Sequence, residues 1–337
     1  MTKKLILLFV FILIWVTAVP TYVFGSTIDS TRHLGEDYIE ELFIKAVDTL
    51  NRAFINFKLS QLPDNEKQDF DNTIKILTIG NSFSQDIDYY LYEIAKSAGV
   101  NIIVGNLYNS GCSLQRHWTY TSNNDKAYSY YKWESGKITK TENQTMRNAI
   151  LDEKWDYITF QQASADSGVY STYQPYLNNL AAYVKDKAKN KNVKLALNMT
   201  WAYSSESTND GFFYYHYNQK TMFNAIINSY KYASNESQIS LIIPCGTAIQ
   251  NARTNKYLNA VGKELTSDGY HLNAGIGRYI AGLTMFKAII DEEKLDLSLD
   301  DVKFIPESEG ITEKLVRLSK KAVKSAIEYP YNIKTIK

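Results

Sequence analysis

The stretch IKILTIGNSFS, residues 74–84, begins the part of the chain in which strand and helix patterns alternate. Its first six residues are mostly apolar and β-branched, which is typical of a buried strand that ends at Gly80. A helical pattern follows at residues 89–98, and a second β-rich run follows at residues 101–107. The stretch therefore predicts a strand–helix–strand unit with parallel strands and a right-handed crossover.

The same alternation continues to the end of the chain. Further strands are expected at residues 157–160, 194–199 and 239–243, and further helices at residues 145–153, 173–189, 218–233, 274–290 and 312–328. Two β-rich runs around Ser135 and Gly136 predict a β-hairpin inserted above the sheet. Together these patterns predict an α/β fold: a three-layer α/β/α sandwich around a five-stranded parallel sheet, with a hairpin insertion.

Length and charge limit the functions that need to be considered. The chain has 337 residues, 45% of them hydrophobic, which is enough for one large domain. Its 37 Lys and Arg residues balance 36 Asp and Glu residues, and no long run of like charge occurs. Because a nucleic-acid binder normally carries a basic patch, we expect no nucleic-acid partner.

Residues 1–25 have the pattern of a secretory signal peptide. Lys3 and Lys4 precede an apolar run over residues 5–19, and a cleavage after Gly25 is predicted. We therefore expect the protein to be secreted or held at the cell surface. The apolar run is short for a membrane span, so contact with a membrane is expected only if this segment stays uncleaved as an anchor.

The remaining chain divides into two parts. Residues 26–72 are predicted to be a helical leader and a linker, with an amphipathic helix over residues 36–57. Residues 73–337 are predicted to form the main domain, which includes the C-terminal helix.

The two cysteines, Cys112 and Cys245, leave their redox state open. An even pair in an exported protein can form a disulfide, but both can also remain free thiols. Cys112 is a candidate nucleophile only by residue type, because no neighbouring sequence feature would activate it.

Ligands of parallel α/β sheets bind beyond the carboxyl ends of the strands, so we expect the chemistry in the loops there. Gly80, Asn81 and Ser82 follow the first strand, and such a turn can expose the Ser82 hydroxyl beside the amides of the next helix. Gly111 follows the second strand, where a glycine backbone can approach a ligand closely. The alternatives are that Ser82 only caps a helix and that Gly111 only makes a turn.

Two further loops carry polar side chains. Gln161 and Gln162 follow the third strand, and a Gln amide can donate hydrogen bonds. Near the end of the domain, Asp268 precedes His271 by three residues in a turn-like setting, and the chain has only 4 His. A serine nucleophile needs a base that a carboxylate orients, which this pair can supply. The alternative is that Asp268 caps the next helix and His271 is incidental.

Metal and cofactor sites have no support in the sequence. No His-x-x-x-His, His-Glu-x-x-His or Cys-x-x-Cys spacing occurs. Neither a second Gly nor a Gly-Lys-Ser/Thr motif follows Gly80, which disfavours a phosphate-binding loop. We therefore expect no metal and no cofactor.

The order of these loops resembles the SGNH (GDSL-like) hydrolase superfamily over residues 74–290. GNSFS at residues 80–84 is similar to the first conserved block of this superfamily, with Asn where Asp is usual. Gly111 matches the glycine of the second block, and DGYH at residues 268–271 matches the last block. The third block departs, because QQAS at residues 161–164 replaces Gly-x-Asn-Asp. The chain resembles the DUF4886 family in particular, through its GNSF, GCSL, WDY, QQ, TWA and DGxH elements.

This resemblance implies the sheet order 2-1-3-4-5 and assigns roles to residues. Ser82 is the implied nucleophile, His271 its acid/base partner and Asp268 the group that orients His271. The backbone amides of Ser82 and Gly111, with the Gln162 side chain, are the implied oxyanion hole. The implied function is that of a secreted serine esterase, which hydrolyses O-acyl esters of a small molecule or a glycan.

The aromatic content suggests a carbohydrate as the alcohol part of an O-acetyl ester. The chain has 26 Tyr, 14 Phe and 5 Trp, and residues 212–217 are aromatic in a polar setting that suits sugar rings. Candidate substrate contacts are Gln161, Trp118, Trp133 and Trp201, although each aromatic can be ordinary core packing. The altered third block also allows the alternative of a catalytically inactive glycan-binding or cell-surface protein on the same fold.

Overall fold

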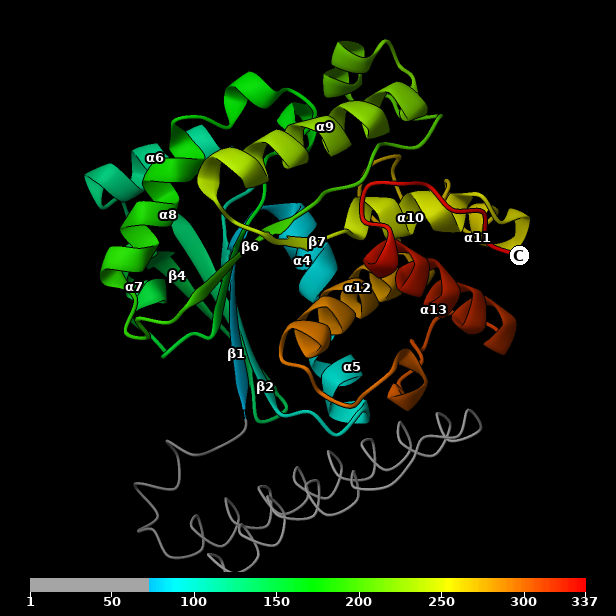
Figure 1. The fold of residues 1–337 in the computed structure, drawn as a ribbon, viewed down its shortest axis with the longest axis horizontal. Coiled ribbons are helices and arrows are strands. Elements are labelled where there is room, and N and C mark those ends of the chain that lie inside the picture. Colours follow the sequence, from blue (N-terminus) through cyan, green and yellow to red (C-terminus); the bar gives the residue numbers. More distant parts are fainter. Residues whose placement is uncertain (1–72) are drawn as a thin grey trace, which may run out of the picture. The chain divides into compact units, whose positions relative to one another are not determined.

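The computed structural model describes residues 73–337, which form an α/β unit (Figure 1). The α/β class predicted from the sequence is confirmed. The predicted signal peptide, residues 1–25, and the predicted leader and linker, residues 26–72, lie outside the described residues. No helix within residues 73–337 is both long enough and apolar enough to cross a membrane.

Seven strands form one mixed sheet in the order β4-β3-β2-β1-β5-β6-β7. Its five parallel strands are β1 (Ile74–Gly80), β2 (Ile102–Tyr108), β5 (Tyr157–Phe160), β6 (Lys194–Asn198) and β7 (Leu241–Ile243). Numbered along the chain, these five strands have the spatial order 2-1-3-4-5. Because β1 lies between β2 and β5, the loops that follow these three strands meet at one edge of the sheet.

The hairpin of β3 (Tyr128–Glu134) and β4 (Lys137–Gln144) corrects the prediction of a five-stranded parallel sheet. It does not lie above the sheet, because β3 pairs antiparallel with β2 and extends the sheet. Without the hairpin β2 would be an edge strand with unpaired backbone groups. The new edge strand, β4, is almost fully exposed and carries Lys and Glu side chains, which oppose pairing with another chain.

Helices cover both faces of the sheet and make three layers with it (Figure 1). One face carries α4 (Ser82–Asp88), α5 (Leu91–Ser97), α10 (Cys245–Arg253), α12 (Ile276–Glu292) and α13 (Glu313–Glu328), with the short α11 (Lys256–Asn259) packed on α10 and α13. The other face carries α6 (Leu114–Asn123), α7 (Met146–Ile150), α8 (Tyr176–Lys187) and α9 (Gln219–Ser237).

The helix predicted at residues 89–98 is α5, and a second, unpredicted helix, α4, precedes it and ends before Tyr89. α4 begins directly after β1 because Asn81 caps it. The Asn81 Oδ1 atom accepts a hydrogen bond from the Phe83 backbone at 3.0 Å.

A buried polar network attaches the C-terminal end of α4 to the sheet. Asp88 Oδ2 accepts hydrogen bonds from Thr78 Oγ1 on β1 and from Asn106 Nδ2 on β2, at 2.5 and 2.6 Å. Among the described residues neither Asp88 Oδ1 nor Asn106 Oδ1 has a partner. Burial raises the pKa of Asp88 to about 7, although the two hydrogen bonds act to lower it.

This pKa predicts how stability depends on pH. Folded Asp88 keeps its proton up to about pH 7, whereas in the unfolded chain it loses the proton near its ordinary value of 3.8. The free energy of unfolding therefore falls as the pH rises from 3.8 to about 7, by at most about 1.4 kcal/mol per pH unit. We expect Asp88→Asn, which cannot ionise, to lack this fall and to melt above the wild type at pH 8. Melting followed by circular dichroism measures both effects, and identical pH dependence in the two proteins would contradict the assignment.

Candidate active site

The turn between β1 and α4 presents Ser82 at the carboxyl edge of the sheet. β1 ends at Gly80, and Asn81 is extended, with φ of −133° and ψ of −154°. A Cβ atom at Gly80 would lie 2.8 Å from Ser84 Oγ, so a larger residue would crowd the first turn of the helix. Ser82 is the first residue of α4, and its side chain is half-buried.

A second loop, residues 266–273, holds Asp268 and His271 in a tight turn. The Ser267 backbone N–H donates to His271 O at 2.9 Å. Asp268 Oδ1 accepts from the backbone N–H groups of Tyr270 and His271, at 3.1 and 2.8 Å. These bonds fix the carboxylate beside the imidazole of the same turn.

The two loops bring Ser82, His271 and Asp268 into series. Ser82 Oγ lies 2.8 Å from His271 Nε2, and His271 Nδ1 lies 2.7 Å from Asp268 Oδ2. Burial acts to raise the pKa of Asp268, but the hydrogen bonds from His271 and Tyr270 hold it below its ordinary value. The carboxylate therefore stays ionised beside the imidazole and can stabilise its protonated form.

The side chain of Asn81 connects the turn before Ser82 to two other loops. Asn81 Nδ2 donates to Cys112 O at 3.1 Å, and Asn81 Oδ1 accepts from Gln161 Nε2 at 2.8 Å. A backbone hydrogen bond of 3.1 Å from Asn109 N to Gly80 O adds a second link. Asn81 is 2% exposed, so these bonds are shielded from water. In the sequence, Asn81 stands out only as a departure from the family pattern, and this role was not predicted.

Of the two other predicted oxyanion donors, Gly111 lies in the loop to which Asn81 is hydrogen-bonded, whereas the side-chain amide of Gln162 is bound elsewhere. Gly111 has φ of +57°, a conformation that favours glycine. Gln162 Nε2 donates to Thr172 O and Thr172 Oγ1, at 3.1 and 2.9 Å. Gln162 Oε1 accepts from the Leu114 backbone at 2.9 Å. Both amide N–H groups thus have partners away from Ser82, which conflicts with the predicted oxyanion role of Gln162.

The other predicted substrate contacts are mostly buried. Gln161 is 1% exposed and bonds to Asn81, so it supports the nucleophile turn. Trp201 is fully buried, stacks on Phe83 with ring centroids 4.2 Å apart, and donates from Nε1 to Tyr270 O at 2.7 Å. The prediction that Trp133 and Trp201 form a sugar-binding wall is therefore wrong, because both side chains belong to the core. Trp118 on α6 is only half-buried and stays a prediction.

Asp86, in the middle of α4, joins this helix to the second loop. Its buried carboxylate accepts from the Leu272 backbone on Oδ2 and from Arg278 Nε on Oδ1, each at 2.8 Å. Burial raises the pKa of Asp86 to about 6, against the lowering effect of Arg278. Because Leu272 follows His271 directly, the helix that begins with Ser82 also holds the backbone beside His271. No motif of the sequence marks Asp86 or Arg278, so neither residue was predicted.

Three further groups that could serve as a nucleophile or a base are buried. Cys112 and Cys245 are buried free thiols, and burial raises the pKa of Cys112 to about 12. Burial, with a smaller effect of Arg116, lowers the pKa of His117 to about 3. These groups are therefore held in their neutral forms away from solvent.

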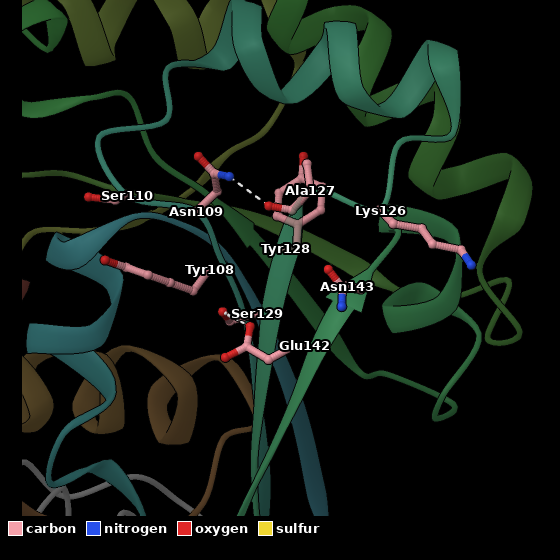
Figure 2. Close-up of a pocket in the computed structure, with 9 residues that line it drawn as sticks. All are labelled: Tyr108, Asn109, Ser110, Lys126, Ala127, Tyr128, Ser129, Glu142 and Asn143. Atoms are coloured by element: carbon pink, nitrogen blue, oxygen red, sulfur yellow. Dashed lines mark hydrogen bonds between the residues drawn. The ribbon is translucent and has the colours of Figure 1, made fainter.

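A polar pocket of about 170 Å³ lies where β2 ends and the hairpin begins (Figure 2). Tyr108 and Ser110 lie on one side of it, and Lys126 and Asn143 lie on the other (Figure 2). The complete lining is Tyr108, Asn109, Ser110, Lys126, Ala127, Tyr128, Ser129, Glu142 and Asn143. Because Asn109 and Ser110 directly precede Gly111, the pocket adjoins one of the loops that meet at Ser82.

Three solved structures are similar to this chain. A DUF4886 family protein from Bacteroides uniformis ATCC 8492 is 40% identical, over 79% of this chain and 100% of that chain, with a TM-score of 0.73. A protein from Slackia heliotrinireducens that is proposed to be an SGNH hydrolase is 17% identical over 65% of this chain and 100% of that chain, with a TM-score of 0.41. Axe2, an acetylxylan esterase from Geobacillus stearothermophilus, is 12% identical over 70% of this chain and 97% of that chain, with a TM-score of 0.40.

No curated protein matches the chain. The model of the family described as "Domain of unknown function (DUF4886)" matches residues 75–326. With this match and the 40% identical structure, the chain belongs to the DUF4886 family.

Proposed function

We propose that this protein is a serine esterase with Ser82 as its nucleophile. The observation that carries the proposal is the pair of contacts from Ser82 to His271 and from His271 to Asp268, at 2.8 and 2.7 Å. A hydroxyl, an imidazole and a carboxylate in this series are the arrangement that activates a serine for acyl transfer.

The proposed reaction has two stages. Ser82 Oγ attacks the ester carbonyl carbon while His271 Nε2 takes the hydroxyl proton, and the proton then goes to the leaving alcohol. Water next attacks the acyl-enzyme with His271 as the base, which releases the acid and restores Ser82. Asp268 orients His271 and stabilises its imidazolium form. The backbone N–H groups of Ser82 and Gly111 are the proposed donors to the oxyanion.

The proposed substrate is an O-acyl ester, with O-acetyl groups on carbohydrate as the preferred case. The polar pocket beside Gly111 supports this choice, because its side chains offer hydrogen bonds to hydroxyl groups and little apolar surface to a long acyl chain. Export of the chain, predicted from residues 1–25, would place the enzyme where it meets extracellular glycans.

One observation favours a second candidate, an inactive glycan-binding protein on the same fold. Gln162 has its two N–H groups bound to Thr172, so one predicted oxyanion donor is absent from the site. Removal of one oxyanion donor costs about 10²–10³ in kcat in other hydrolases, which slows turnover without abolishing it. The esterase proposal therefore requires measurable hydrolysis.

Removal of the nucleophile tests the proposal directly. We expect Ser82→Ala to lower kcat on 4-nitrophenyl acetate by at least about 10³-fold, because the remaining groups cannot form an acyl-enzyme. The matched control is Ser122→Ala, an exposed serine on α6, which should keep wild-type activity. Wild-type rates in Ser82→Ala would refute the assignment, and an inactive wild type would favour the glycan-binding alternative.

A second prediction concerns Asp86 as a positioning residue. Asp86→Asn keeps the size of the side chain but replaces one acceptor oxygen by an N–H donor that faces the Leu272 N–H or Arg278, so we expect the free energy of unfolding to fall by about 1–3 kcal/mol. We also expect kcat on 4-nitrophenyl acetate to fall roughly tenfold with little change in KM, because the backbone beside His271 loses an anchor. The control is Asp291→Asn, which removes an exposed ion pair with Lys287 on α12.

Adding Arg278→Leu to the Asp86→Asn variant separates stability from positioning. Arg278→Leu removes one of the two donors that compete for the single remaining oxygen, so the stability of the double variant should recover in part while its kcat stays low. Recovery of kcat together with stability would show that Asp86 has only a structural role.

A further inference from the structure

A series of aromatic rings leads from His271 toward the surface. The Tyr270 ring lies 4.1 Å from that of His271, and the Tyr203 ring lies 5.7 Å from that of Tyr270. Phe212 continues the series at 5.6 Å from Tyr203, and Tyr217 lies 5.9 Å from Phe212. Tyr203 and Phe212 are fully buried, so the series passes through the core before it reaches the surface at Tyr217.

The outer end of this series is an exposed group of three rings, which we name the aromatic platform. Phe213, Tyr214 and Tyr217 are 63%, 62% and 59% exposed. The Phe213 ring lies 6.2 Å from that of Tyr214 and 6.4 Å from that of Tyr217. Exposed apolar side chains that lie next to one another often mark an interaction site.

The segment that carries the platform, η4 (Asp210–Tyr215), is firmly attached to the domain. Phe212 and Tyr215 are buried beneath it. The Tyr215 hydroxyl accepts from Gly168 N at 2.9 Å and donates to Ala165 O at 2.7 Å. The outward rings are thus presented by an anchored segment.

The backbone after η4 is held in an unfavourable conformation that places Tyr217 beside Phe213. His216 and Tyr217 have φ values of +55° and +53°, which cost a non-glycine residue roughly 1–2 kcal/mol each. The His216 backbone N–H donates to Phe213 O at 3.0 Å, and the Tyr217 N–H donates to Phe212 O at 3.1 Å. Such strain persists where the surrounding structure enforces it, and it gathers at binding sites.

We propose that the aromatic platform binds a neutral carbohydrate chain whose ester group lies at Ser82. The proposal rests on the proposed esterase function and adds the binding surface for the rest of the substrate. Flat rings with polar edges stack well on sugar rings, and the four steps of the ring series limit the distance between Tyr217 and His271.

The charges around the platform favour a neutral polymer over other ligands. Residues 207–219 contain one charged side chain, Asp210, and no Leu, Ile or Val, and the flanking Glu206 and Lys220 carry opposite charges. An anionic lipid surface or an acidic polymer would require basic side chains, and insertion into lipid would favour aliphatic ones.

The test compares a long substrate with a small one. The variant is the triple substitution Phe213→Ala, Tyr214→Ala and Tyr217→Ala, with Tyr214→Ala alone as a second variant in case the triple one fails to fold. The control is Tyr232→Ala with Tyr257→Ala, which removes two rings that are 59% and 46% exposed elsewhere on the surface. The probes are xylan, glucomannan and amylose, each before and after chemical O-acetylation, together with 4-nitrophenyl acetate.

We expect the triple variant to keep wild-type kcat/KM on 4-nitrophenyl acetate within about twofold. On at least one acetylated polymer its kcat/KM should fall roughly tenfold or more through KM, because three stacking contacts are lost. Tyr214→Ala alone should give a smaller loss of the same kind, and the control should match the wild type.

Binding gives a readout that does not depend on hydrolysis. In the Ser82→Ala background, at least one of the polymers should retard the protein in affinity electrophoresis, and the triple variant should lose this retardation. The proposal for the platform would be overturned if Ser82→Ala and the triple variant in that background were retarded equally, or if none of the polymers retarded the protein. The platform would also be overturned if the triple substitution converted a dimer to a monomer in sedimentation and left glycan binding unchanged. That result would identify a second copy of the chain as the ligand of these rings. A wild type that binds but hydrolyses no ester would instead refute the proposed function and leave the platform supported.

Discussion

The hydrogen bond between Ser82 Oγ and His271 Nε2 joins two loops that are 189 residues apart in the sequence. Neither loop can place its side chain alone, because the bond needs the end of β1 and the turn before α12 to be held at the same edge of the sheet. Asn81 holds the first loop against the neighbouring ones, and Asp86 holds the second loop against α4. The proposed chemistry therefore depends on two buried polar side chains that do not themselves touch a substrate.

The helix α4 shows how the fold and the site depend on each other. It has only seven residues, too few to be stable in isolation, and three of them, Ser84, Asp86 and Asp88, are buried polar residues. Asp88 bonds to β1 and β2, and Asp86 bonds to the loop that carries His271. The tertiary hydrogen bonds thus stabilise the helix, and the helix in turn fixes the position of Ser82.

Much of this arrangement could be predicted, because the strands are apolar runs and the chemistry follows their carboxyl ends. The structure brings Ser82, His271 and Asp268, which the order of the motifs singled out, into contact with one another. The pattern of apolar residues is less informative about helices that bury few of them, and α6 was not predicted. This helix buries only Leu114, His117 and Thr121, so its hydrophobic periodicity is weak. The hairpin was misplaced because its position depends on the free edge of β2, which no local pattern encodes.

The errors at the site have a related cause. Strand alternation puts Gln161 and Gln162 on opposite sides of β5, but it does not say which side faces Ser82. The structure shows that Gln161 bonds to Asn81, while Gln162 bonds to Thr172. Exposure is equally hard to infer for aromatic residues, since Trp201 lies in the core while Tyr214 lies on the surface.

Site mapping of a covalent label is the most direct test of the central claim, that His271 activates the Ser82 hydroxyl. The protein would be treated with a fluorophosphonate, digested and analysed by mass spectrometry, with His271→Ala as the comparison. We expect one labelled residue, Ser82, and strongly slowed labelling in His271→Ala. Absence of label on Ser82, or labelling that does not depend on His271, would contradict it.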